Sequence, residues 1–367
     1  MSTPLPEIPG YKTIREMGRG VCGLVFAAES IADRTSCALR VLQADSKYSH
    51  GEAEAIAACA SKVAALPSHP NVARILGVIP GPPTVIAMEL MMVQPLSAAV
   101  PPTTRLRGPI ALEIARQVAS GLAHAHQNGV VHGHIHPGNI YVAKDGTAKL
   151  TGFLGQSPSA GCRESGGPAS VFAFLAPEQL TSEPICSPAT DVYSLAAVLY
   201  EWLTGRRVND GGGAALSVRA HRAELPASLD LAMRRALSSD PAHRFPNAAE
   251  FLVALEKVGM EPPANLADWV AAGCPAAENQ VVTLNLPESA LTPIPESPRV
   301  RPQETVEEVP TKPNAPRRGI GTALVVILLM VLLTAAAVAW ILWQGGSSAK
   351  VIPGVRAIPQ LAPKNSP

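Results

Sequence analysis

The chain has 367 residues, and its 30 lysines and arginines nearly balance 29 aspartates and glutamates, so the net charge is +1 at pH 7. This balance gives no strong basic field and argues against a nucleic-acid-binding protein. The length suits about two domains. Hydrophobic residues reach 47% of the chain, and part of that share comes from one apolar stretch near the C-terminus.

The first third of the chain predicts β-structure. Residues 11–30, "YKTIREMGRGVCGLVFAAES", contain two strand-like runs around a glycine-rich turn. Residues 36–43, "SCALRVLQ", predict a third strand, and 83–92 predict another after an Ala-rich helix over 51–68. Alternation in the third strand places two sets of side chains on opposite faces: Cys37, Leu39 and Val41, and Ala38, Arg40 and Leu42.

Helical patterns follow residue 108. Residues 110–129 repeat apolar side chains four positions apart, and Gly129 suits the C-terminal end of that helix. Residues 191–205 are strongly apolar, which is typical of a buried helix, and they also end at a glycine. A small strand-rich lobe is therefore expected before a larger helical lobe.

The C-terminal part has a different composition. Residues 258–319 contain 11 prolines in 62 positions and predict a mostly extended, disordered linker. Residues 320–343 carry no charge, and as a helix they span about 36 Å, which predicts one transmembrane helix. The short tail 344–367 is too small to fold alone.

Charges beside the apolar stretch predict its orientation. Arg317 and Arg318 directly precede it, and the positive-inside rule favours a cytoplasmic N-terminal part in a plasma or inner membrane. All six cysteines lie before the stretch and none forms C-x-x-C, as expected for reduced thiols in a cytosolic domain.

The glycine-rich turn is the first chemical motif. Gly18, Gly20 and Gly23 form G-x-G-x-x-G, followed by Val25. Because the motif lies between two strand-like runs, it suits a hairpin that covers phosphates, although a plain hairpin also explains it.

Further motifs follow in a fixed order: "CALR", "HPNVARILGV", "IAMEL", "VVHGHIHPGNIYV", "GFL", "FAFLAPEQL", "SPATDVYSLAAVLYEWLTG" and "DPAHRF". This order resembles the protein-kinase family, in particular bacterial membrane-anchored serine/threonine kinases. The resemblance covers residues 11–257, after a short tail 1–10. It implies an α+β, two-lobed fold with a β-rich small lobe and a helical large lobe.

The resemblance also implies roles for individual residues. The glycine loop, Ala38, Arg40, Met88 and Glu89 would contact a nucleotide. His132 and Asn139 would belong to the catalytic loop, with Asn139 as a weak metal ligand. The remaining matches are structural: Phe153 in the D-F-G position, Ala176, Pro177 and Glu178 in A-P-E, Asp191 in the large-lobe helix, and Arg244 as the partner of Glu178.

Several positions depart from the family pattern. The strand-three lysine is Arg40, and the H-R-D motif reads His132-Gly133-His134. The catalytic-loop lysine is His136, and the D-F-G aspartate is Gly152. The helix glutamate expected to pair with the strand-three lysine is assigned to Glu54, with Glu52 as the alternative.

These departures remove the groups on which phosphoryl transfer depends. Magnesium binds hard oxygen ligands, usually including a carboxylate, and Gly152 supplies none. The sequence therefore predicts a membrane-tethered pseudokinase with no intact catalytic residue, which acts as a scaffold or allosteric regulator of a signalling protein. Binding of ATP or ADP is expected to be weak and independent of magnesium.

Two other functions compete with this prediction. The first is an atypical serine/threonine kinase of low activity that transfers phosphate from ATP to protein. The second is a metal sensor, because five histidines fall within 13 residues: His124, His126, His132, His134 and His136. Ordinary, partly exposed loop histidines are the favoured explanation of that cluster.

Overall fold

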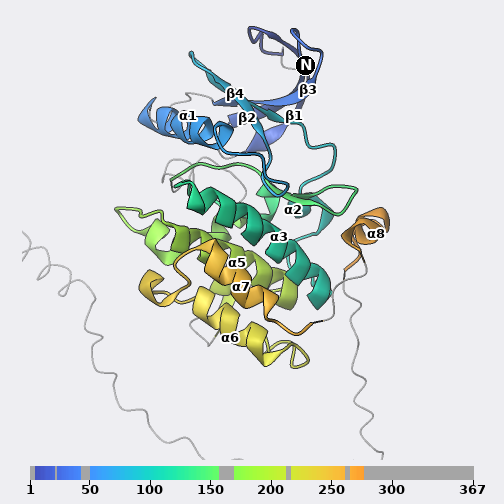
Figure 1. Ribbon diagram of the computed structural model, residues 1–367, viewed down its shortest axis with the longest axis vertical. Helices are drawn as coiled ribbons and strands as arrows, with labels where there is room; N and C mark the ends of the chain where they lie inside the picture. The colour runs from blue at the N-terminus through green and yellow to red at the C-terminus, as the bar shows by residue number, and fades with distance from the viewer. Residues whose placement is uncertain are drawn as a thin grey trace, which may run out of the picture. The chain divides into compact units, whose positions relative to one another are not determined.

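The computed structural model describes residues 5–20, 23–42, 50–156, 169–211, 216–260 and 265–276. All of them belong to one unit, residues 1–283. A sheet with one helix lies above a larger group of helices (Figure 1). The two-lobed α+β fold that the sequence predicts is therefore confirmed in these residues.

The small lobe is a five-stranded antiparallel sheet. Its strands are β1 (Tyr11–Gly20), β2 (Gly23–Ser30), β3 (Ser36–Leu42), β4 (Ile75–Ile79) and β5 (Thr84–Glu89). They are arranged in the order β1-β2-β3-β5-β4, so β3 lies at the centre. The helix α1 (His50–Ala64) contacts β4 and β5.

Alternation along β3 directs its side chains as predicted. Cys37, Leu39 and Val41 join one apolar cluster on the sheet, whereas Leu42 joins Ile56 of α1 in another. Arg40 belongs to the same face as Leu42 because the two are separated by two positions. The third strand thus has one face toward α1 and Leu154 of the large lobe.

The large lobe contains α2 (Leu96–Ala99), α3 (Gly108–Gln127), α5 (Pro188–Thr204), α6 (Ala227–Ala236) and α7 (Ala248–Glu256). Two short strands, β6 (Ile140–Val142) and β7 (Ala148–Leu150), form a separate hairpin. The predicted apolar face of α3 is buried, with Ile114, Val118 and Leu122 fully covered. The helix α5 is buried along its whole length and ends at Gly205, whose φ of 68° suits a glycine.

One predicted boundary is wrong. The helix α8 (Leu266–Ala271) lies inside the segment 258–319 that the proline content marks as a linker. Leu266 and Trp269 are buried in the large-lobe core, and Trp269 Nε1 donates a hydrogen bond to the carbonyl of Pro275. Two apolar side chains three positions apart are enough to attach this short helix, although the composition around them is polar and proline-rich.

The predicted transmembrane segment 320–343 and tail 344–367 lie outside the described residues. Among the helices that the structure describes, none has the length and apolar character needed to cross a membrane.

Candidate functional site

The glycine motif lies in the hairpin of β1 and β2. Gly18 pairs with Val25 and Gly20 pairs with Gly23, so the motif forms the end of the hairpin, whose tip residues 21–22 are outside the described part. Val25 pairs in turn with Arg40 of β3. The predicted nucleotide-binding positions are therefore brought together on neighbouring strands.

The residues expected to contact a nucleotide base lie on β3 and β5 of the sheet. Ala38 pairs with Met88 of β5, and both are buried. Glu89, the last residue of β5, forms an ion pair with Lys149 of β7 and accepts a hydrogen bond from the backbone N–H of Arg74. This ion pair links β5 of the small lobe to β7 of the large lobe.

Arg40 occupies the centre of the sheet and points toward the large lobe. Its charge lowers the pKa of both His132 and His136, after the larger effect of their burial. Its Nε atom is buried and has no hydrogen-bond partner among the residues that the structure describes. Arg40 therefore brings a positive charge, and an Nε donor without a partner in the described residues, to the side of the sheet that faces the catalytic loop.

The helix α1 clarifies which glutamate faces this region. Glu52 is half-buried on the side of the helix that carries Ile56 and Cys59, whereas Glu54 is exposed on the other side. Residues four and seven apart share a helix face. The burial favours Glu52 over Glu54, the first choice from the sequence.

Asp191, at the start of α5, holds the catalytic loop in place. Its carboxylate accepts hydrogen bonds from the backbone N–H of His132 at 2.7 Å and of Gly133 at 2.8 Å. It also accepts one from Nε2 of His126 at 2.9 Å. Because His126 Nδ1 accepts from the N–H of Ala248, the proton of that imidazole is on Nε2.

His132 connects this loop to the D-F-G position. Its Nδ1 accepts from the N–H of His134, so its Nε2 carries the proton and donates to the carbonyl of Thr151 at 2.8 Å. Its ring packs on Phe153 with centroids 4.5 Å apart. The hydrogen bonds and the ring contact together fix the backbone on both sides of Gly152.

The three loop histidines are buried, so their predicted partial exposure is wrong. His132, His134 and His136 expose only 0%, 2% and 8% of their surface. Burial, with smaller contributions from His132 and Arg40, lowers the pKa of His136 to about 3. That imidazole is therefore neutral at pH 7.

The rings of the loop stack against the segment that follows the D-F-G position. His134 lies 4.5 Å from the ring of His136 and 6.0 Å from that of Phe172, centroid to centroid. Phe172 belongs to a 3-10 helix, Ala169–Phe174. At the position of the family's catalytic aspartate, the chain thus has a buried ring between two others.

Gly152, at the position of the family's metal-binding aspartate, is covered by the side chain of Asn139. Gly152 has a φ of +79°, and a Cβ added to it would lie 2.5 Å from Oδ1 of Asn139. Asn139 is held there because its Nδ2 donates to the carbonyl of His134 at 2.9 Å. The one side chain predicted to ligate magnesium therefore packs directly on the glycine that replaces the other ligand.

Gly133 is similarly enclosed. Its φ is +81°, and a Cβ would lie 2.6 Å from the carbonyl oxygen of Gln156 and 3.0 Å from Sγ of Cys186. The carbonyl belongs to the backbone and cannot rotate away like a flexible side chain. The chain after the D-F-G position passes so close to the loop that the family's arginine cannot be accommodated here without a backbone shift.

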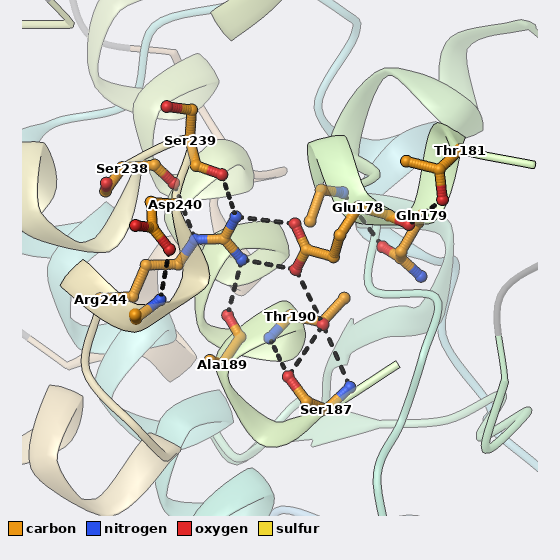
Figure 2. Close-up of polar contacts among 12 residues, drawn as sticks. Glu178, Gln179, Thr181, Ser187, Ala189, Thr190, Ser238, Ser239, Asp240 and Arg244 are labelled. Atoms are coloured by element: carbon orange, nitrogen blue, oxygen red, sulfur yellow. Dashed lines mark hydrogen bonds and ion pairs between the residues drawn. The ribbon is translucent and has the colours of Figure 1, made fainter. Parts of the chain in front are cut away.

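The structural ion pair of the large lobe is intact, as Figure 2 shows. Arg244 Nη1 and Nη2 bind the two carboxylate oxygens of Glu178 at 2.7 Å and 2.8 Å. Thr190 donates a hydrogen bond to the same carboxylate. The other donors of Arg244 bind backbone carbonyls of Ser238, Ser239 and Ala189.

The histidine cluster does not converge on a metal site. Within the described residues, no group of three His, Cys, Asp or Glu side chains is arranged to hold a metal ion. The residues 132–136 form a loop and not a regular strand, so alternate positions do not share one face.

Comparison with known proteins agrees with this geometry. The sequence profile described as protein kinase domain matches residues 11–256. The chain belongs to the protein kinase domain family. The kinase domain of PknI from Mycobacterium tuberculosis shares the fold, with a TM-score of 0.57 and 24% identity over 69% of this chain and 97% of that one.

Curated relatives of this kinase domain are bacterial serine/threonine-protein kinases. The kinase drp72 of Corynebacterium efficiens is 33% identical over 53% of this chain and 40% of its own length. PknA of Mycobacterium tuberculosis is 32% identical over 48% of this chain and 44% of its own. PrkC of Bacillus subtilis is 28% identical over 65% and 39%. The chain thus spans about two fifths of the length of these relatives.

Two contributors to the site escape prediction from the sequence. Lys149 is one of many scattered lysines, and only the pairing of β6 with β7 directs it to Glu89. Phe172 belongs to a segment without regular periodicity. No local signal indicates that it stacks on His134, because the contact joins residues 38 positions apart.

Proposed function

We propose that this chain is a membrane-tethered protein with a kinase fold that acts by binding a signalling protein and not by transferring phosphate. The observation that supports this most is the contact between Asn139 and Gly152. Where a kinase needs two oxygen ligands for magnesium, this site has one neutral amide, whose nitrogen donates to the His134 carbonyl and whose oxygen lies against Gly152.

The loss of the base supports the same function. A general base must lie within hydrogen-bond distance of the acceptor hydroxyl in a bound substrate. His134 is buried between His136 and Phe172. A substrate hydroxyl reaches this imidazole only if Phe172 moves away.

A serine/threonine kinase of low activity is the second candidate. It is favoured by the relatives, which are named serine/threonine-protein kinases. It is also favoured by two structural features of the family that are intact: Asp191 positions the catalytic loop, and Arg244 keeps its ion pair with Glu178.

Phosphate transfer from radiolabelled ATP separates the two candidates. The full chain is incubated with Mg²⁺ or Mn²⁺ and a generic basic protein, with an active bacterial kinase as positive control. We expect no label in the chain or the added protein. Label that appears with the unmodified chain and disappears in the Asn139→Ala variant would establish kinase activity and reject the binding function.

The membrane tether has its own test. Residues 1–319 are proposed to lie in the cytoplasm, with residues after Gln344 outside. Protease added to intact cells is expected to remove only an epitope placed on the tail. Digestion of the kinase domain in intact cells, with a cytoplasmic marker protein undigested, would reverse this orientation.

A further inference from the structure

A cluster of arginines surrounds the C-terminal end of α5. Asp191, which holds the catalytic loop, lies near the start of α5, and Thr204 is its last residue, so the helix between them spans about 20 Å. Arg105 donates from Nε to the carbonyl of Thr204 at 3.0 Å, and Arg222 donates from Nη1 to the carbonyl of Leu106 at 2.9 Å. The segments before α3 and before α6 therefore meet at the end of α5, away from the catalytic loop.

The cluster carries more positive than negative charge. Two of its four arginines, Arg207 and Arg222, are each paired with a glutamate. The other two, Arg105 and Arg206, are exposed, and no carboxylate in the described part of the chain pairs with them. Burial lowers the pKa of His221 below its ordinary value, and the charges of Arg206 and Arg105 lower it further. A positive potential that nearby acids do not cancel has this effect on an imidazole.

The structural contacts of the two unpaired arginines leave donors unused. The C-terminal end of a helix carries a partial negative charge of about half a unit, which explains why arginine side chains gather there. Among the residues that the structure describes, however, Arg105 donates only through Nε, and the guanidinium of Arg206 makes no hydrogen bond. Both Nη groups of Arg105 and the donors of Arg206 are therefore available to an external oxygen.

These donors and their charge suit phosphate oxygens. The planar guanidinium binds two phosphate oxygens at once and is more weakly hydrated than an ammonium group. An exposed pair of unpaired guanidinium groups therefore fits a surface that presents many phosphates, such as a bilayer with acidic phospholipids. Each arginine close to such a surface favours the contact by about fivefold.

The proposed tether selects the membrane among the possible anionic partners. Residues 277–319 have the composition of a flexible linker, and a flexible chain of that length has an r.m.s. end-to-end distance of about 35 Å. A bilayer attached through residues 320–343 is therefore always within reach of the domain, whereas a soluble acidic protein has to be recruited from solution. A weak attraction from a few arginines is then enough for contact.

We propose that the arginines at the C-terminal end of α5 dock the kinase domain onto a bilayer that contains anionic phospholipids. This inference rests on the membrane tether of the proposed function and adds an orientation to it. The face that carries Arg105 and Arg206 lies on the phospholipid headgroups.

Hydrogen exchange on the full chain reconstituted in nanodiscs tests the proposal. One set of nanodiscs contains phosphatidylcholine alone, and the other contains a mixture of phosphatidylcholine and phosphatidylglycerol. We expect the backbone amides of residues 205–207 and 217–223 to exchange at least about fivefold more slowly on the anionic discs, because the headgroups cover this face in the docked state. Salt at about 0.5 M shortens the screening length to about 4 Å and should remove most of the difference.

Charge-matched variants assign the docking to these side chains. Arg105→Gln combined with Arg206→Gln removes two charges from the proposed surface, and its amides should exchange alike on both kinds of disc. Lys12→Gln combined with Arg15→Gln removes two exposed charges from β1 and is the matched control, which should keep the slower exchange on anionic discs. Arg206→Gln alone avoids the contact of Arg105 with the helix end, and should lower the slowing by up to about fivefold if the double variant is less stable.

The outcomes distinguish this inference from the proposed function. Equal exchange of the unmodified chain on both kinds of disc would overturn the docking surface while leaving the tether and the binding function standing. Slowing that survives both the double and the single arginine variant, or that the β1 control abolishes, would also overturn it. Soluble polyglutamate is added to the phosphatidylcholine discs as a last arm, and equal slowing there would identify an acidic protein in place of lipid. A chain that does not enter nanodiscs at all would remove the tether and this inference together.

Discussion

Two regions of the molecule differ in how much of the family's pattern they keep: the ion pair of Arg244, and the catalytic-loop residues together with Arg40 of β3. Around Arg244, every group has its partner: a carboxylate, a threonine hydroxyl beside it and three backbone carbonyls. Between the lobes, four functional groups of the family are replaced: the strand-three lysine by Arg40, the catalytic aspartate by His134, the catalytic-loop lysine by His136 and the metal-binding aspartate by Gly152.

The difference shows that the framework of a kinase fold is separable from its chemistry. Removing one partner from a buried ion pair leaves a desolvated charge and costs about 3–5 kcal/mol, so such a pair is hard to lose. Groups that face a ligand contribute little to folding, and glycine or a neutral imidazole replaces them without leaving an unpaired charge. The following predictions test this contrast.

The largest effect on stability is expected from the buried ion pair of Arg244 with Glu178. Arg244→Ala should lower the free energy of unfolding by about 3–5 kcal/mol, because it leaves Glu178 buried without its cation. Denaturant titration of the full chain measures the change. Arg234→Ala removes an exposed arginine from α6 and should change the same quantity by less than about 0.5 kcal/mol. If the two variants lowered the free energy of unfolding equally, the buried ion pair would not have the structural importance assigned to it.

A smaller effect is the dependence of folding stability on pH that the buried His136 produces. The folded pKa of His136 is about 3, below its ordinary value of 6.5, so between these values the unfolded chain binds a proton that the folded chain does not. Stability should therefore fall as the pH drops below about 6.5, by up to about 1.4 kcal/mol per pH unit from this group.

The variant His136→Gln isolates that contribution. Glutamine does not titrate, so the slope of stability against pH between about 4 and 6 should become shallower. His243→Gln changes an exposed histidine and is the matched control. Thermal unfolding at several pH values measures both variants, and an unchanged slope in His136→Gln would show that His136 is not buried as a neutral ring.

The smallest effect on stability, but a decisive one for function, is expected from restoring one acid. Gly152→Asp should cost about 1–2 kcal/mol, since a non-glycine residue is strained at a φ of +79° and must displace Asn139. It should not restore phosphate transfer, because His134 and Arg40 remain. If Gly152→Asp alone produced a magnesium-dependent kinase, His134 and Arg40 would not prevent phosphate transfer, contrary to the proposed function.

Much of the fold follows from local patterns in the sequence. The faces of β3, the apolar side of α3 and the glycine after α5 were predicted because alternation, four-residue spacing and a glycine stop each reflect the geometry of one element. The family match rests on several such elements in order. The helix α8 was missed because two buried side chains outweigh a composition typical of linkers.

The sequence by itself determined which chemical groups are present: no carboxylate at positions 134 and 152, an arginine at position 40, and a complete set of framework residues. Only the tertiary structure decided what the remaining groups do. Three histidines are buried, Asn139 contacts Gly152, and Phe172 stacks on His134. These features depend on segments that are distant in the sequence, so helix or strand periodicity does not predict them. Composition states which charges exist, but desolvation and close packing, which depend on the whole fold, determine which of them can act.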